Sequence, residues 1–439
     1  MDGDTVERAV LVGLVRGREE RAVLDEHLDE LERLMETAGA EVVERMIQER
    51  EAPDPATLVG RGFVGRLGER CGALGASTVV FDDDLSPSQL RNVEALLPEN
   101  VKVLDRAAVI LDIFARHART REAQTQVELA QLDYLLPRLA GRWLHLSRQV
   151  GGIGTRGVGE TQLEIDRRLV SRRITRLRRR LERIERTRRL RRKGRDGVPT
   201  VALVGYTNAG KSSLLRRLTH AEVVVGDRLF ATLDPRARRL DLGDGLLVVV
   251  TDTVGFIRKL PHELVAPFRS TLEEAARADL VLHVVDGSHP SWEAQLRVGD
   301  AVLADLGVAA ERTLVVVNKI DRMPRNRVTQ VCRTVDGLPV SAATGAGLDR
   351  LRRVVFERLL REGGLQLVRV PLDDPDAVRR AMDSGSMVAR RFGPDSVTFA
   401  LRLDPERLES LRLSAFRVTQ WAGESAGRED HDADLRVSL

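Results

Sequence analysis

Short apolar runs alternate with longer amphipathic stretches along most of the chain. Near its beginning, apolar runs at residues 10–15, 79–82 and 101–104 predict buried strands, and residues 24–38 and 87–97 repeat apolar positions at the helical period. Strands that alternate with helices are typical of α/β domains with a parallel sheet. We therefore expect a small α/β domain at this end, without a catalytic constellation of its own.

Two apolar stripes at helical spacing flank a glycine-rich stretch. The first lies in a helical pattern over residues 113–136 and consists of Ala123, Val127, Ala130 and Tyr134. The second consists of Val170, Ile174, Leu177, Leu181 and Ile184. Facing stripes of this kind predict an antiparallel coiled-coil hairpin, with residues 141–160 as its tip.

Further apolar runs at residues 201–204, 246–250, 280–285 and 314–317 predict four more buried strands, again separated by helical patterns. Polar motifs follow three of these runs directly. Ligands bind at the carboxyl ends of the strands in doubly wound α/β sheets, so the pattern predicts such a sheet with a binding site at that edge.

The first of these motifs is GYTNAGKS, residues 205–212, between a predicted strand and a predicted helix. This is the G-x-x-x-x-G-K-S phosphate-binding loop, whose backbone N–H groups surround phosphate oxygens. Lys211 is expected to reach the β- and γ-phosphates and to act in catalysis, and the Ser212 hydroxyl to bind Mg²⁺. The predicted nucleotide ligands here are Gly205, Asn208, Ala209, Gly210, Lys211, Ser212 and Ser213.

The second motif is DTVG, residues 252–255, after the run at residues 246–250. Asp252 is placed to bind Mg²⁺ through water, and the Gly255 N–H to meet a γ-phosphate, which makes Gly255 a catalytic candidate.

The third motif is NKID, residues 318–321. A carboxylate at Asp321 accepts hydrogen bonds from guanine N1–H and N2–H, a pair of donors that adenine lacks, so the motif favours GTP over ATP. Asn318 and Lys319 belong to the same base site, and Ser341, Ala342 and Ala343 complete it, with the Ala342 N–H directed at guanine O6.

Charge is unevenly distributed along the chain. The net charge is only +4, but residues 161–195 hold 16 basic and four acidic residues, which leaves −8 for the remainder. Such a concentration is typical of a polyanion-binding surface, although an arginine-rich solvated helix is an alternative. Lysine is scarce among the 70 basic residues, so we expect the lysines that are present to serve where a compact ammonium is needed. They are Lys102, Lys193, Lys211, Lys259 and Lys319.

In order and spacing, the three nucleotide motifs resemble the translation-factor class of P-loop GTPases. The resemblance implies that FATLDP, residues 230–235, is switch I and that Thr232 is a catalytic ligand of Mg²⁺ and the γ-phosphate. Ras-type enzymes carry a glutamine after the switch II glycine, where Phe256 stands here, and a phenyl ring cannot orient the attacking water. Intrinsic hydrolysis is therefore expected to be slow until a partner, a monovalent cation or both complete the site.

The glycine-rich stretch makes the resemblance more specific. GGIGTRGVGETQLEIDRR, residues 151–168, together with VGYTNAGKSSLL, FATLDP and DTVGFIRKLPHELVAPFRSTLEEA, resembles the HflX family of ribosome-associated GTPases. LVGRGFVGRL and FDDDLSPSQLRNVE resemble its N-terminal domain, so that the resemblance covers residues 11–361. Val158 stands where the family usually has proline, and Arg236-Ala237 where hydroxyl residues are usual, which leaves the loop geometry and switch I open.

The resemblance implies GTP-dependent binding to the large ribosomal subunit and, in some members, splitting of stalled ribosomes. The basic helix and the glycine-rich loop are the parts expected to contact ribosomal RNA. Two alternatives remain: a GTP-regulated RNA-binding module with little turnover, and a GTPase coupled to RNA modification. Some related GTPases use an asparagine at the position of Asn208 to coordinate K⁺, which makes K⁺ a candidate cofactor beside Mg²⁺; the alternative is that Asn208 only makes hydrogen bonds within its loop.

The fold class predicted is α/β, comprising an N-terminal α/β domain with an antiparallel coiled-coil hairpin, a doubly wound P-loop GTPase domain and a small C-terminal α+β domain. The expected boundaries are residues 1–105, 106–196, 197–362 and 363–422, followed by a disordered tail at 423–439. The two cysteines lie far apart, and no apolar run reaches the roughly 18 residues of a membrane span. We therefore expect a cytoplasmic protein, and we also expect it to be a monomer.

Overall fold

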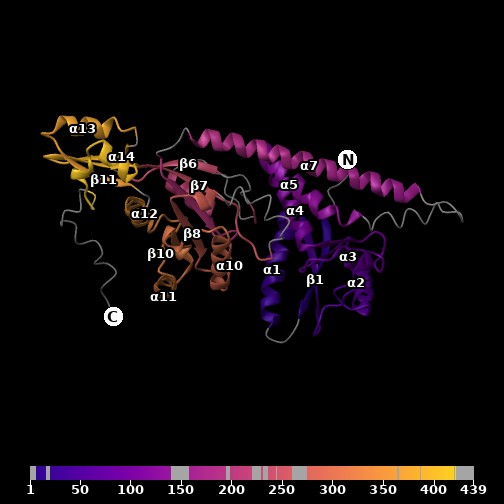
Figure 1. Ribbon diagram of the computed structural model, residues 1–439. Coiled ribbons are helices and arrows are strands. Elements are labelled where there is room, and N and C mark those ends of the chain that lie inside the picture. The colour runs from indigo at the N-terminus through magenta and orange to yellow at the C-terminus, as the bar shows by residue number, and fades with distance from the viewer. Residues whose placement is uncertain are drawn as a thin grey trace.

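The computed structural model describes residues 6–15, 20–139, 158–193, 198–219, 229–230, 236–243, 245–259, 274–362, 365–385, 387–419 and 421. Three sheets organise these residues into an N-terminal, a central and a C-terminal unit, as Figure 1 shows. Mixed α/β architecture with parallel sheets confirms the predicted fold class.

The N-terminal unit is built on a four-stranded parallel sheet in the order β2-β1-β3-β4. Its elements are β1 (Glu7–Val15), α1 (Glu20–Ala38), β2 (Ala40–Glu49), α2 (Arg61–Leu74), β3 (Thr78–Phe81), α3 (Pro87–Glu94), β4 (Lys102–Asp105) and α4 (Arg106–His117). Successive residues of β1 point to opposite faces, so Leu11 packs with α1 and α4, whereas Val10 packs with α2 and α3. A central strand covered on both faces explains the uninterrupted apolar run in β1.

The central unit contains a six-stranded sheet in the order β10-β9-β8-β5-β7-β6, parallel except for the edge strand β6. Its elements are β5 (Thr200–Gly205), α8 (Lys211–Thr219), β6 (Arg236–Asp241), β7 (Leu247–Asp252), β8 (Leu280–Asp286), α10 (Trp292–Asp305), η1 (Ala310–Arg312), β9 (Thr313–Asn318), η2 (Ile320–Arg322), α11 (Arg325–Val335), β10 (Leu338–Pro339) and α12 (Leu348–Glu362). Helices α8 and α12 share one core cluster, and α10 contributes to a second. This is the predicted doubly wound sheet, and its parallel strands bring the three polar motifs to one edge.

The C-terminal unit is an antiparallel sheet in the order β11-β13-β12. Its elements are β11 (Gln366–Pro371), α13 (Pro375–Met382), β12 (Met387–Phe392), β13 (Ser396–Leu401), α14 (Pro405–Ser410) and η3 (Ser414–Phe416). Leu365 and Leu367 join the central core cluster beside Leu359 of α12. The unit is therefore packed against the central sheet through an apolar contact.

The helical region differs from the prediction in two ways. The single helix expected over residues 113–136 is wrong, because α4 ends at His117 and α5 (Arg121–Leu135) begins anew, with the Ala123 N–H donating to the Thr120 side chain at its N-cap. The predicted facing stripe is also misassigned: Ala123, Val127, Ala130 and Tyr134 pack into the N-terminal core. The opposite face of α5 meets the second helix instead.

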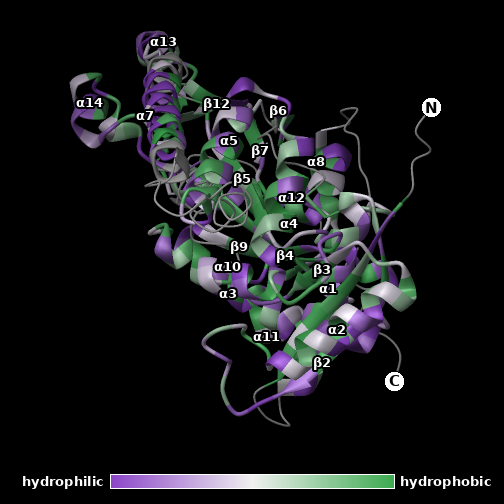
Figure 2. Cartoon of the chain, turned by 90° about the vertical axis from the view of Figure 1, so that its right-hand side faces the viewer, coloured by the Kyte–Doolittle hydropathy of each residue, from purple (hydrophilic) through white to green (hydrophobic). Residues whose placement is uncertain are grey.

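The second helix, α7 (Val158–Lys193), is a single long rod that reaches from the N-terminal unit towards the central unit in Figure 1. Ile174 and Leu177 of its predicted stripe are buried against Leu129 of α5. Arg173 and Arg178 pair with Glu128 and Asp133 of α5 beside this contact. Figure 2 shows α7 as predominantly hydrophilic. The predicted hairpin tip, except for the first turn of α7, lies outside the described residues.

Candidate functional site

The phosphate-binding loop connects β5 to α8 in the predicted strand-loop-helix order. Gly205 and Gly210 have φ values of +141° and +93°, and an added Cβ would lie 2.1 Å from the Val284 carbonyl oxygen and 2.3 Å from the Asn318 side chain, respectively. Only glycine fits at either position. Asn208 also has a left-handed backbone, at φ 60°, and its side chain is exposed. The loop therefore has the tight curvature that a phosphate cradle needs.

Lys211 begins α8 and is almost completely buried. Its Nζ donates to the carbonyl oxygens of Gly205 and Tyr206, at 2.9 and 2.8 Å. Burial lowers the pKa of Lys211 to about 8, and the nearby charge of Asp252 only partly opposes this shift. The ammonium thus lies inside the loop, where bound phosphates would stabilise its charged form.

The residues predicted to hold Mg²⁺ meet where α8 begins and β7 ends. The Ser212 hydroxyl donates to Asp252 Oδ2 at 2.6 Å, and Asp252 is fully buried. A hydroxyl and a carboxylate oxygen this close suit a hard cation such as Mg²⁺. The third predicted ligand, Thr232, lies outside the described residues.

The segment after β7 lies directly on the phosphate-binding loop. An added Cβ at Gly255 would lie 2.8 Å from Thr207 Cα. The Phe256 N–H donates to the Gly205 carbonyl at 3.0 Å, and the Thr207 N–H donates to the Phe256 carbonyl at 2.8 Å. Phe256 itself is buried in the core beside α10, with its ring centroid 6.4 Å from that of His283. Its ring is an anchor for this segment and not a group that faces the phosphates.

The two segments of the predicted base site, residues 318–321 and 341–343, come together. The Asn318 side chain donates to the Ala209 carbonyl at 2.8 Å and accepts from the Ala342 N–H at 3.0 Å, which joins the base site to the phosphate-binding loop. The Ser341 hydroxyl donates to Asp321 Oδ1 at 2.5 Å. Asp321 remains exposed, with its carboxylate oriented by Ser341.

Two other predicted ligands occupy accessible positions at the site. Ala343 is exposed after Ala342, and Ser213 is partly buried in the first turn of α8. Lys319 pairs with Asp286 at 2.8 Å. Asp286 follows the predicted strand at residues 280–285, and its place beside NKID at the same sheet edge is the sequence signal for this pairing.

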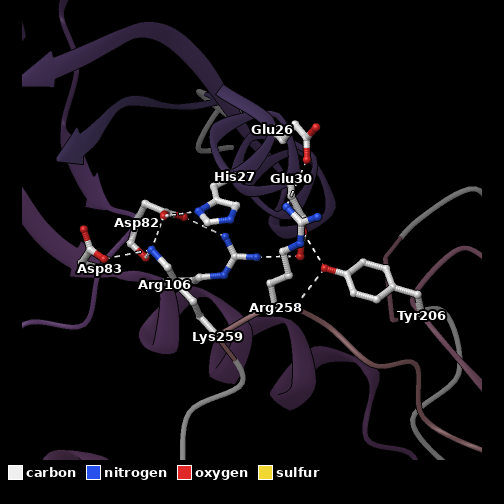
Figure 3. Close-up of polar contacts among 9 residues, drawn as sticks. All are labelled: Glu26, His27, Glu30, Asp82, Asp83, Arg106, Tyr206, Arg258 and Lys259. Atoms are coloured by element: carbon white, nitrogen blue, oxygen red, sulfur yellow. Dashed lines mark hydrogen bonds and ion pairs between the residues drawn. The ribbon is translucent and has the colours of Figure 1, made fainter. Parts of the chain in front are cut away.

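The N-terminal unit borders the nucleotide site, which no motif in the sequence predicts. Figure 3 shows Tyr206 of the phosphate-binding loop directed at Glu30 of α1, and the Tyr206 hydroxyl donates to Glu30 Oε2 at 2.7 Å. A cleft of about 340 Å³ between the two units is lined by Thr207 and Asn208 on one side and by α1 on the other. Contacts between residues this far apart in sequence leave no local pattern to detect.

Within the described residues, every helix is too short or too polar to cross a bilayer.

Comparison with known protein families matches three consecutive parts of the chain. Residues 25–115 match the family described as GTP-binding GTPase N-terminal, residues 117–195 the GTP-binding GTPase Middle Region, and residues 200–319 the 50S ribosome-binding GTPase family.

Relatives match over nearly the whole chain. GTPase HflX of Lacrimispora saccharolytica is 48% identical over 412 residues, which cover 93% of this chain and 96% of that protein. GTPase HflX of Escherichia coli is 46% identical over 374 residues, 84% of this chain and 86% of that protein. Among solved structures, the chain is similar to a GTP-binding protein from Sulfolobus solfataricus in complex with GDP, at 24% identity and a TM-score of 0.44, covering 80% of this chain and 98% of that one.

Proposed function

The chain belongs to the HflX family of GTPases, and from this premise we propose that it uses GTP binding and hydrolysis to control its association with the large ribosomal subunit. The nucleotide chemistry is assigned to the residues described above. Lys211 and the Gly255 N–H would contact the γ-phosphate, and Ser212 and Asp252 would hold Mg²⁺, which stabilises the charge that develops on the phosphates.

Guanine would be bound by Asp321, with Asn318 and Lys319 supporting the base site. Ser341 orients the Asp321 carboxylate before the base arrives, which reduces the ordering needed on binding. Because Phe256 is held in the core, the chain offers no glutamine-like group at this position, and we assign completion of the site to the ribosome. A role for K⁺ at Asn208 stays a prediction.

The proposal that the chain binds the ribosome rests on the exposed arginines of α7. Six exposed arginines line one surface of this helix: Arg168, Arg172, Arg176, Arg179, Arg180 and Arg183. In the part of the chain that the structure describes, none of the six has a carboxylate partner, whereas Arg173 and Arg178 are used to hold α5. Unpaired arginines along a rigid rod fit the phosphate groups of folded RNA.

The test replaces Arg168, Arg172, Arg176 and Arg180 together with glutamine and measures binding to large ribosomal subunits over a range of salt concentrations. If each arginine contacts one phosphate, the slope of log affinity against log salt should become shallower by about 3. A matched control replaces Arg325, Arg333, Arg350 and Arg353 of the central unit, which are also exposed, and should keep the slope. An unchanged slope in the α7 variant would instead support a solvated helix.

Splitting of stalled ribosomes is a further step of the same proposal. The direct check is sedimentation of intact ribosomes incubated with the protein and a GTP analogue, in which free subunits should appear.

A further inference from the structure

A cluster of nine polar residues joins the N-terminal unit to the nucleotide site (Figure 3). Glu26, His27, Glu30, Asp82, Asp83 and Arg106 come from the N-terminal unit, and Tyr206, Arg258 and Lys259 from the central unit. Tyr206 belongs to the phosphate-binding loop, and the other two follow DTVG closely. Both loops that contact a γ-phosphate are therefore attached to one surface of another unit.

Asp82 is the centre of this cluster and is fully buried after β3. It accepts from Arg106 Nη1 at 2.8 Å and from Lys259 Nζ at 2.5 Å, with His27 Nδ1 at 3.5 Å. Burial alone would raise the pKa of Asp82, but the hydrogen bond with His27 and the charges of Arg106 and Lys259 hold this pKa well below its usual range. Asp82 is thus a fixed negative charge to which Lys259 is attached.

The lysine makes a second ion pair, with Asp83 Oδ1 at 2.8 Å, and its backbone is left-handed at φ 49°. That conformation is disfavoured for residues other than glycine, so local preference alone would not select it. Lys259 is also one of only five lysines, and a compact ammonium suits a position between two neighbouring carboxylates. Ion pairs with the other unit therefore accompany a backbone conformation that local preference disfavours.

Apolar contacts reinforce the attachment. Val254 and Ile257 on either side of Phe256 pack into the N-terminal core cluster, as do Leu229 and Phe230. The rings of Phe230 and Phe114 meet edge to face, 4.6 Å apart. The ends of both switch segments are therefore anchored on the N-terminal unit.

This attached arrangement leaves little space for a γ-phosphate beside Gly255. The Gly255 N–H has to reach the γ-phosphate, but a Cβ added at Gly255 would already lie 2.8 Å from Thr207 Cα, and the next peptide is hydrogen-bonded to the same loop. A phosphate between Gly255 and the loop would require residues 254–257 to move away from Thr207. Because Lys259 follows so closely, such a movement would pull its ammonium away from Asp82 and Asp83.

We propose that Lys259 is a latch whose ion pairs with Asp82 and Asp83 hold the segment after Gly255 in its GTP-free position, and that GTP binding opens it. This inference rests on the proposed function and names how the nucleotide site is regulated. Binding of GTP then has to break these ion pairs, which lowers the affinity for GTP. GDP makes no contact with Gly255 and binds with the ion pairs intact. By linkage, a partner that pulls the N-terminal unit away raises the affinity for GTP by the same factor.

The test uses the full chain and measures the affinities of GDP and of a non-hydrolysable GTP analogue. Lys259→Met removes the ammonium and keeps the aliphatic stem, while Asp82 retains Arg106 as its partner. The variant should bind the GTP analogue about fivefold more tightly or better, with GDP affinity unchanged. Lys259→Arg keeps the charge and should stay closer to the parent chain.

Lys102→Met is the matched control. It breaks a lysine-carboxylate pair that lies wholly within the N-terminal unit, the 3.1 Å contact with Glu7. It should leave both affinities as they are. If Lys259→Met unfolds, Asp83→Asn is the second variant, because it removes one of the two ion pairs of Lys259 at a partly exposed carboxylate. It should raise the affinity for the GTP analogue by a smaller factor.

An unchanged ratio of the two affinities in a folded Lys259→Met protein would overturn the latch, and so would weaker binding of the GTP analogue. Failure of the parent chain to bind either guanine nucleotide would instead overturn the proposed function, and the latch with it.

Discussion

Asp321 is the residue on which base selectivity is expected to depend, and Ser341 holds its carboxylate ready. In Asp321→Asn an amide replaces the acceptor of two guanine N–H groups, so GTP affinity should fall by about a hundredfold and xanthosine triphosphate should be preferred. Titration with both nucleotides measures this. Asp336→Asn, at the exposed end of α11, is the control and should keep the preference for GTP. Undiminished GTP affinity in Asp321→Asn would remove its base-reading role.

Lys211 gives nucleotide binding a dependence on pH. Its pKa is lowered to about 8 in the free protein, and the charge of bound phosphates should raise it, so nucleotide binds the protonated form. Affinity should therefore be constant below the lowered pKa and should fall by about threefold from about pH 7.5 to about pH 8.5, with proton uptake on binding. Calorimetry in two buffers of different ionisation enthalpy measures this uptake. Binding at the higher pH without proton uptake would contradict the account.

Site residues were predictable where chemistry demands a fixed spacing. Gly205, Gly210 and Lys211 were found because a phosphate loop needs those residue types in that order, and the structure places them as a cradle. The sequence singles out Lys259 only as one of five lysines, and it predicts neither its partner Asp82 nor the contact of Tyr206 with Glu30, because these partners are 177 and 176 residues away. No local pattern records such contacts.

At the scale of elements, burial decides what the sequence reveals. Strands β1, β5 and β8 are covered on both faces and appear as continuous apolar runs. Strands β2 and β6 lie at sheet edges and mix charged with apolar residues, and neither was predicted. These two edge strands carry less of the core, so their patterns are weaker.

Helix α5 shows a second limit of periodicity. Both of its faces are apolar, because one packs into the N-terminal core and the other against α7. A repeat at helical spacing identified the first stripe correctly as buried but could not say which partner buries it. The break before α5 depends on capping by Thr120, a short signal inside a long helical pattern.

The arrangement of the whole molecule combines three features that the sequence presented separately. Helix α7 with its basic face is tied through α5 to the N-terminal unit, and the N-terminal unit is tied through the proposed latch at Lys259 to the segment that follows DTVG. A partner bound to α7 is therefore in a position to act on GTP, which is the central claim of this account.

The most direct test of that claim is the GTP hydrolysis rate of the full chain with and without purified large ribosomal subunits. The chain alone should turn over slowly, since Phe256 cannot orient water, and saturating subunits should raise the rate by about tenfold or more. Replacing the four arginines of α7 should abolish most of this stimulation while leaving the rate of the isolated protein unchanged. An equal rate with and without subunits would contradict the account and would favour an RNA-binding module that barely turns over GTP.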